Sequence, residues 1–152
     1  MTLLALDLGT NCGWCVGDDA HHVSGTWALK PGRYESSGMR FVKFRTALRE
    51  IIKAYPVGHV VYEEVRRHAG TDAAHIYGGL MATLQAFCEE YKLPYDAIPV
   101  GTIKKFWTGK GNANKAAMIA ECEDRGLFVR DDNEADAVAL FHCKIQDGDI
   151  QC

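Results

Sequence analysis

A carboxylate within an apolar segment near the N-terminus is the feature that most constrains this chain. Residues 2–9 form a short apolar run that ends at Gly9 and carries Asp7 near its end. Such a run predicts a buried β-strand, and an ionised carboxylate is costly to bury unless it is paired or bound to a metal ion. Asp7 is therefore a candidate metal ligand, with a turn-forming Asp before Gly9 as the local alternative.

Strand and helix patterns follow along the rest of the chain. They predict strands at residues 2–9, 12–18, 21–29, 57–62 and 95–100, and helices at 36–54, 72–92, 102–107, 113–125 and from 131 onward. We expect Asp72 to cap the helix at 72–92, and we expect Gly126 to close the helix at 113–125. We expect Asp131 and Glu134 to form a capping box. The order indicates an α/β fold with a mixed five-stranded sheet, whose first three strands form an antiparallel meander.

Length and charge narrow the class of protein. The 152 residues suit a single domain spanning residues 1–152. A formal net charge of −3 argues against a passive basic coat on nucleic acid, but an enzyme that gathers carboxylates around metal ions can still bind DNA through clustered basic residues. The N-terminus lacks the features of a signal peptide, and no stretch is long enough to span a membrane. We therefore expect a cytoplasmic protein with no membrane partner, whose cysteines are reduced.

Two further carboxylates lie where they could meet Asp7. Glu63 follows the apolar residues 60–62 at the end of a predicted strand, and Asp136 lies between two alanines early in the last predicted helix. Alone, Glu63 or its neighbour Glu64 would be a solvated strand end. Together the three carboxylates offer the hard oxygen ligands that Mg²⁺ prefers. Two such ions about 4 Å apart can activate a water molecule and stabilise the leaving oxygen of a phosphodiester.

At these positions the chain resembles the RuvC family of Holliday junction resolvases, in the small form known from bacteriophages. The resemblance covers nearly the whole chain and is carried by residues 5–14, 61–65, 72, 76–78, 100–115 and 134–140. It implies a ribonuclease H-like, RuvC-type fold with helices on both faces of the sheet. It also implies that Asp7, Glu63 and Asp136 hold two Mg²⁺ ions per active site, with Mn²⁺ as the alternative metal.

The same resemblance implies a reaction and partners. The enzyme would be a metal-dependent endodeoxyribonuclease that nicks four-way junctions and other branched DNA without a nucleotide cofactor. If phage-encoded, it would act in the bacterial host cytoplasm, where it would debranch replicating DNA before packaging. Paired nicks require two active sites, so we expect a homodimer. The helix at 72–92 is a candidate dimer surface, with Leu80, Leu84 and Phe87 available to pack.

The chain departs from the family pattern at two positions. The family usually has a fourth metal-site residue, often Asp, three positions before the last Asp, and Asn133 occupies that position here. Asp132 lies one residue earlier, and four-residue spacing places it on the same helix face as Asp136. We therefore favour Asp132 over Asn133 as the fourth catalytic and metal-binding residue. The second departure is Arg66, which stands where some resolvases have an aromatic wedge that bears on junction selectivity.

Basic residues gather around these motifs. They are Arg66, Arg67, Lys104, Lys105, Lys110 and Lys115. Positive charges at the rim of a metal site would neutralise phosphates and give affinity without reading sequence, so we predict that these residues contact DNA. A solvated helix face is the alternative for Lys104 and Lys105.

Cys12 and Cys15 have the Cys-x-x-Cys spacing that is found in zinc and redox sites. Because side chains alternate along a strand, we expect the two thiols to point to opposite faces of the sheet. The sequence therefore predicts no zinc site at this pair.

Three other functions are compatible with parts of the sequence. A ribonuclease H-like nuclease could act instead on RNA, hybrid or flap substrates, because fold alone does not decide among substrates. Residues 7–10 also resemble the phosphate loop of sugar kinases and heat-shock ATPases, but those proteins enclose a nucleotide between two lobes and this chain has room for one. A catalytically inactive DNA-binding module is the last alternative, and the three carboxylates argue against it.

Overall fold

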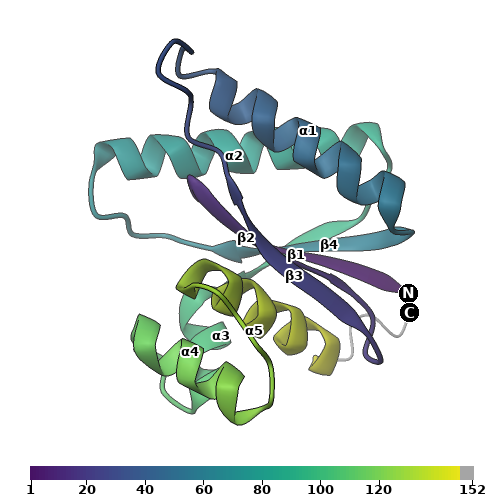
Figure 1. Cartoon of the computed structure of the whole chain (residues 1–152), viewed down its shortest axis with the longest axis vertical. Helices are drawn as coiled ribbons and strands as arrows, with labels where there is room; N and C mark the ends of the chain where they lie inside the picture. The colour runs from purple at the N-terminus through teal and green to yellow at the C-terminus, as the bar shows by residue number, and fades with distance from the viewer. Residues whose placement is uncertain (148–152) are drawn as a thin grey trace.

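The computed structural model describes residues 1–147, and these build one mixed sheet with helices on both faces (Figure 1). The strands are β1 (Thr2–Asp7), β2 (Asn11–Gly17), β3 (His22–Ala28), β4 (Val57–Glu64) and β5 (Tyr95–Pro99). Their order across the sheet is β3-β2-β1-β4-β5. The first three strands pair antiparallel, and β1, β4 and β5 run parallel. The predicted mixed five-stranded sheet with its N-terminal meander is confirmed.

The helices cover the two faces of the sheet unequally. They are α1 (Met39–Ala54), α2 (Thr71–Glu90), α3 (Val100–Thr108), α4 (Lys115–Asp124) and α5 (Asp132–Gln146). Helices α1 and α2 lie on one face, and α3, α4 and α5 lie on the other (Figure 1). Each face has its own apolar core, because successive β1 side chains alternate between them: Leu4 and Leu6 pack under α1 and α2, whereas Leu3 and Ala5 pack under α5.

The cysteines follow the same alternation. Cys12 belongs to the core under α1 and α2, and Cys15 belongs to the core under α5, so the two thiols lie on opposite faces as predicted. The separation rules out a shared metal ion or a disulfide between them in this fold.

Helix α2 corrects two expectations. Asp72 lies in the first turn with an exposed side chain, and within residues 1–147 no side chain caps this helix at Gly70. Leu80, Leu84 and Phe87 are almost completely buried against the chain's own sheet. These three residues therefore cannot form a dimer surface. An apolar stripe on a helix indicates that this face is buried. Its sequence pattern is the same whether the face packs on the chain's own sheet or on a second copy.

The first turn of α5 is fixed by hydrogen bonds to its own backbone and to β3. Asp131 caps the helix by accepting from the amide of Glu134 at 2.8 Å. The capping box is only half formed, because the Glu134 carboxylate accepts instead from the Arg130 amide at 2.9 Å and the Ser24 hydroxyl at 2.7 Å. The Thr26 hydroxyl donates to Asp131 at 2.9 Å. These contacts hold the start of α5 against the sheet edge.

Most helix ends lie within three residues of their predicted positions. Gly126 closes α4 with a positive φ of 75°, as expected for a left-handed helix end. Helix α1 begins at Met39 rather than at residue 36, because the preceding residues 36–38 form a turn. Among the described residues, no helix combines the length and the apolar character needed to cross a membrane.

Candidate metal centre

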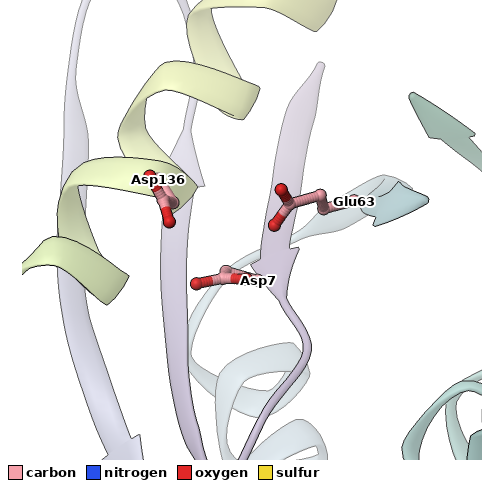
Figure 2. Close-up of side chains that lie close together, drawn as sticks. All are labelled: Asp7, Glu63 and Asp136. Atoms are coloured by element: carbon pink, nitrogen blue, oxygen red, sulfur yellow. The ribbon is translucent and has the colours of Figure 1, made fainter. Parts of the chain in front are cut away.

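Three carboxylates from distant parts of the chain converge at one end of the sheet (Figure 2). Strands β1 and β4 are parallel, and Leu6 pairs with Tyr62, so the next residues, Asp7 and Glu63, lie side by side at the same end of the two strands. Asp136 comes from the second turn of α5. One oxygen from each carboxylate lies within 4.8 Å of the other two. The geometry therefore brings together the three predicted metal ligands.

A glycine on β2 permits the approach of α5. Gly13 pairs with Asp7 across the sheet, and a Cβ at this position would lie 1.9 Å from the backbone carbonyl oxygen of Asn133. Only glycine allows helix and strand to come this close. Ala135, two residues further along the same turn of the helix, is also fully buried. The signal for this contact in the sequence is Gly13 itself, since a glycine inside a strand often marks a close backbone approach, but it does not reveal which element approaches.

Charge repulsion and burial dominate the electrostatics of the cluster. Burial raises the pKa of Asp7 well above its usual range, and the charge of Glu63 is the next largest cause. Burial, and then the charges of Glu63 and Asp132, raise the pKa of Asp136 to about 7. The chain thus concentrates carboxylates and compensates them only in part, through the positive charges of Lys104 and Lys115. Three oxygen ligands at this spacing fit a hard divalent cation such as Mg²⁺ or Mn²⁺.

Asp132 lies at the rim of this cluster. Its carboxylate oxygen is 3.6 Å from the Nζ of Lys115, and its negative charge contributes to the raised pKa values of Asp7 and Asp136. It is not one of the three residues whose oxygens meet within 4.8 Å. Asn133 packs its backbone carbonyl against β2. Asp132 is therefore close enough to act on the cluster electrostatically, from one helical turn before Asp136.

Two predicted DNA-contacting lysines lie beside the carboxylates. Lys104 on α3 and Lys115 at the start of α4 both lower the pKa of Asp136 through their positive charges. Lys105 and Lys110 are exposed, on α3 and on the loop that follows it. Positive charge therefore borders the carboxylate cluster on the face covered by α3, α4 and α5.

The two predicted arginines follow β4 directly. Both side chains are exposed, and Arg66 forms an ion pair with Glu64 at 2.6 Å while remaining 80% exposed. Arg67 lines a groove of about 360 Å³ together with the turn from Pro99 to Gly101, where β5 becomes α3. Both arginines lie within four residues of Glu63 along the chain, and their role in DNA contact stays a prediction.

Comparison with known proteins identifies the fold. No protein-family model and no curated protein matches the chain. Among solved structures, Thermus thermophilus RuvC in complex with a Holliday junction substrate is similar at 21% identity and a TM-score of 0.76, over 92% of this chain and 90% of that one. A second Thermus thermophilus RuvC structure is similar at 20% identity and a TM-score of 0.73, over 97% of each chain.

A eukaryotic protein shows the same likeness. The yeast mitochondrial Holliday junction resolvase is similar at 14% identity and a TM-score of 0.66, over 95% of this chain and 77% of that one. The chain therefore has the ribonuclease H-like, RuvC-type fold that the sequence resemblance implied.

Proposed function

We propose that this protein is a metal-dependent endonuclease that nicks four-way junctions and other branched DNA. The observation that carries the proposal is the convergence of Asp7, Glu63 and Asp136 at one end of the sheet in a RuvC-type fold. Asp132 is proposed as the fourth acidic residue of the site, acting from the rim. The resemblance to resolvases extends the proposal to a bacteriophage enzyme that acts in the host cytoplasm.

The roles of the residues follow from their positions. Asp7, Glu63 and Asp136 would hold the metal ions. Two bound Mg²⁺ or Mn²⁺ ions would supply an activated water molecule and would stabilise the leaving oxygen of a phosphodiester. Lys104 and Lys115 lie close enough to affect the charge on Asp136, so they are placed to neutralise the phosphates of a strand lying over the site.

A homodimer is part of the proposal, because two nicks across one junction require two active sites. The apolar residues of α2 that face the sheet are already buried, so the second copy must use another surface. Sedimentation analysis of the free protein and of its complex with a junction would test this, with two copies per junction as the expected result.

Cleavage of a synthetic four-way junction tests the proposed reaction. We expect paired nicks with Mg²⁺ or Mn²⁺, loss of nicking in EDTA, and loss of nicking in Asp7→Asn. The exposed Asp124→Asn on α4 is the matched control and should cleave normally. A linear duplex, a flap and an RNA–DNA hybrid complete the panel. Faster cleavage of the hybrid or the flap would favour a different nuclease activity, and failure to cut any branched DNA would overturn the proposal.

A further inference from the structure

A cleft lies between α1 and α2, away from the metal centre. None of its lining residues is among those predicted above to contact DNA. It has a volume of about 490 Å³ and is lined by Ser37, Arg40, Phe41, Asp72, His75 and Ile76. The Phe41 ring packs where a side chain at position 79 would be, since a Cβ on Gly79 would lie 2.5 Å from it. The two helices therefore meet closely at Phe41, and the cleft opens on the side of their N-termini.

Two hydrogen-bonded connections place the cleft at the same end of the sheet as the carboxylates. The hydroxyl of Tyr77, on α2 two residues beyond His75, donates to the Glu63 carbonyl at 2.8 Å and accepts from the Val65 amide at 3.2 Å. The amide of Leu29, where the chain leaves β3 toward α1, donates to the Thr10 carbonyl just after β1, at 2.8 Å. The start of α2 and the segment before α1 are thus both anchored beside the metal centre.

The cleft also lies on the opposite face of the sheet from the lysines. Helices α1 and α2 cover one face, whereas Lys104 and Lys115 belong to α3 and α4 on the other (Figure 1). A DNA strand that crosses the end of the sheet at Asp7 would leave the lysine side and then pass the α1–α2 cleft.

The polar groups of the cleft favour an anion with oxygen acceptors. The Nε of Arg40 is buried and has no hydrogen-bond partner among residues 1–147, which is unusual for a guanidinium donor. His75 and Ser37 can donate to the same ligand, and no side chain within the described residues caps α2 at Gly70. Asp72 is the single carboxylate of the lining and would oppose an anion. The buried Nε itself would not face a ligand, but Arg40 lines the cleft, and a phosphodiester offers the oxygen acceptors that a guanidinium binds.

We propose that the α1–α2 cleft binds the phosphodiester backbone of the DNA strand that passes the metal centre, with Arg40 as the principal contact. This inference rests on the proposed function, and it assigns to the substrate a second contact surface on the face of the sheet away from the lysines. The negative charge of Asp72 would weaken the binding of this strand. Removing the charge of Arg40 should therefore lower the affinity for DNA, and removing the charge of Asp72 should raise it.

Binding of a fluorescent four-way junction, measured by anisotropy as a function of salt, tests the cleft. All variants are made in the Asp7→Asn background so that cleavage does not interfere. We expect Arg40→Gln to weaken binding roughly 5–10-fold and to reduce the slope of log affinity against log salt by about 1, as for one lost phosphate contact. Asp72→Asn should tighten binding about twofold. Arg49→Gln, on the same helix but exposed and outside the cleft, should leave affinity and slope unchanged.

Thermal unfolding of each variant separates lost contact from lost structure. If Arg40→Gln does not fold, Asp72→Asn decides alone, and unchanged affinity in that variant overturns the proposal. Equal effects of Arg40→Gln and Arg49→Gln also overturn it, because general charge would then suffice. Titration with inorganic phosphate provides a further arm. One result of this titration would overturn the DNA assignment and identify a free-anion site. In that result, millimolar phosphate raises the unfolding temperature only when Arg40 is present, whereas junction binding does not depend on Arg40.

Parallel cleavage assays keep this inference apart from the proposed function. Junction cleavage by the wild-type chain together with unchanged binding in Arg40→Gln would overturn the cleft alone. Junction binding that depends on Arg40, without cleavage of any branched DNA, would overturn the nuclease alone. A wild-type chain that binds no DNA would overturn both.

Discussion

Two clusters of charged side chains lie at opposite ends of the same sheet, and they differ in how far their charges are compensated within the chain. At the end where β4 and β5 begin, Asp96 accepts from the Nζ of Lys144 at 2.5 Å and lies 3.0 Å from the Nε2 of His59. Lys144 is only 2% exposed. At the other end, Asp7 and its two partner carboxylates crowd together. One cluster is neutralised within the chain, whereas the other keeps an excess of negative charge.

The difference indicates which cluster serves the structure and which serves a ligand. A buried charge is tolerated when a partner of opposite sign and hydrogen bonds accompany it, as Asp96 accompanies Lys144. Buried like charges without such compensation reduce the stability of the fold. A divalent cation would compensate the charge of the carboxylate cluster at Asp7, because it carries the opposite charge and can be coordinated by all three carboxylates at once.

Asp136→Asn should have the largest effect, because it removes a proposed metal ligand. We expect junction cleavage to fall by at least about 100-fold, since even residues that only orient metal ligands are worth about 10–100-fold. The same change removes one of the crowded charges, so the metal-free variant should unfold at a higher temperature than the wild type at pH 8. Cleavage rates and thermal unfolding in EDTA measure the two effects. Loss of both activity and stability would contradict the comparison.

Asp96→Ala should have the opposite signature. It removes a hydrogen-bonded acceptor from a buried ammonium group, which we expect to lower the free energy of unfolding by about 1.5–3 kcal/mol. Cleavage by the folded fraction should stay within a few-fold of the wild type, because Asp96 lies at the far end of β5 from the metal centre. Urea denaturation at neutral pH measures the loss. Asp124→Ala, at an exposed position, is the control and should change stability by less than about 0.5 kcal/mol.

The stability of the metal-free protein should decrease as the pH rises from about 4 to about 7. The pKa of Asp136 is raised from 3.8 to about 7 by burial and by the charge of Glu63. Within that window the folded chain holds a proton that the unfolded chain has released, so each step up in pH favours unfolding.

Mg²⁺ should reverse this decrease, because it binds the ionised form. Thermal unfolding with and without Mg²⁺ measures both trends, and a difference of 1 kcal/mol corresponds to about 2–4 °C for a domain of this size. A metal-free protein that becomes more stable between pH 5 and pH 8 would contradict the raised pKa.

Among the acidic residues of the site, Asp132→Asn should have a smaller effect on cleavage than Asp136→Asn. Its carboxylate lies at the rim and is partly neutralised by Lys115, so we expect Mn²⁺ affinity and cleavage to fall by about tenfold or less. Asn133→Ala is the comparison, because Asn133 stands where the family usually has its fourth residue. Mn²⁺ affinity measured by calorimetry decides between them. A larger loss in Asn133→Ala would reverse the assignment.

Sequence patterns were sufficient where a residue broke a simple rule. Asp7 is a charge in an apolar strand, and Glu63 and Asp136 lie at the ends of recognisable elements, so the cluster could be predicted before its geometry was known. Lys144 gave no such signal, because a lysine near a helix end is normally solvated and its burial depends on tertiary packing. The prediction that the apolar stripe of α2 packs on a second copy was wrong, because Leu80 packs on the chain's own sheet. The sequence pattern of the stripe is the same in both cases.

Helix α5 connects the two ends of the sheet, since it carries Asp136 near its start and Lys144 near its end. An ion held by Asp136 would therefore add its binding free energy to a helix that lies across the whole core, and the helix could not open without releasing the ion. Amide hydrogen exchange should report this coupling. Metal addition should slow exchange along α5 as far as Lys144, whereas the exposed first turn of α2 should exchange as before.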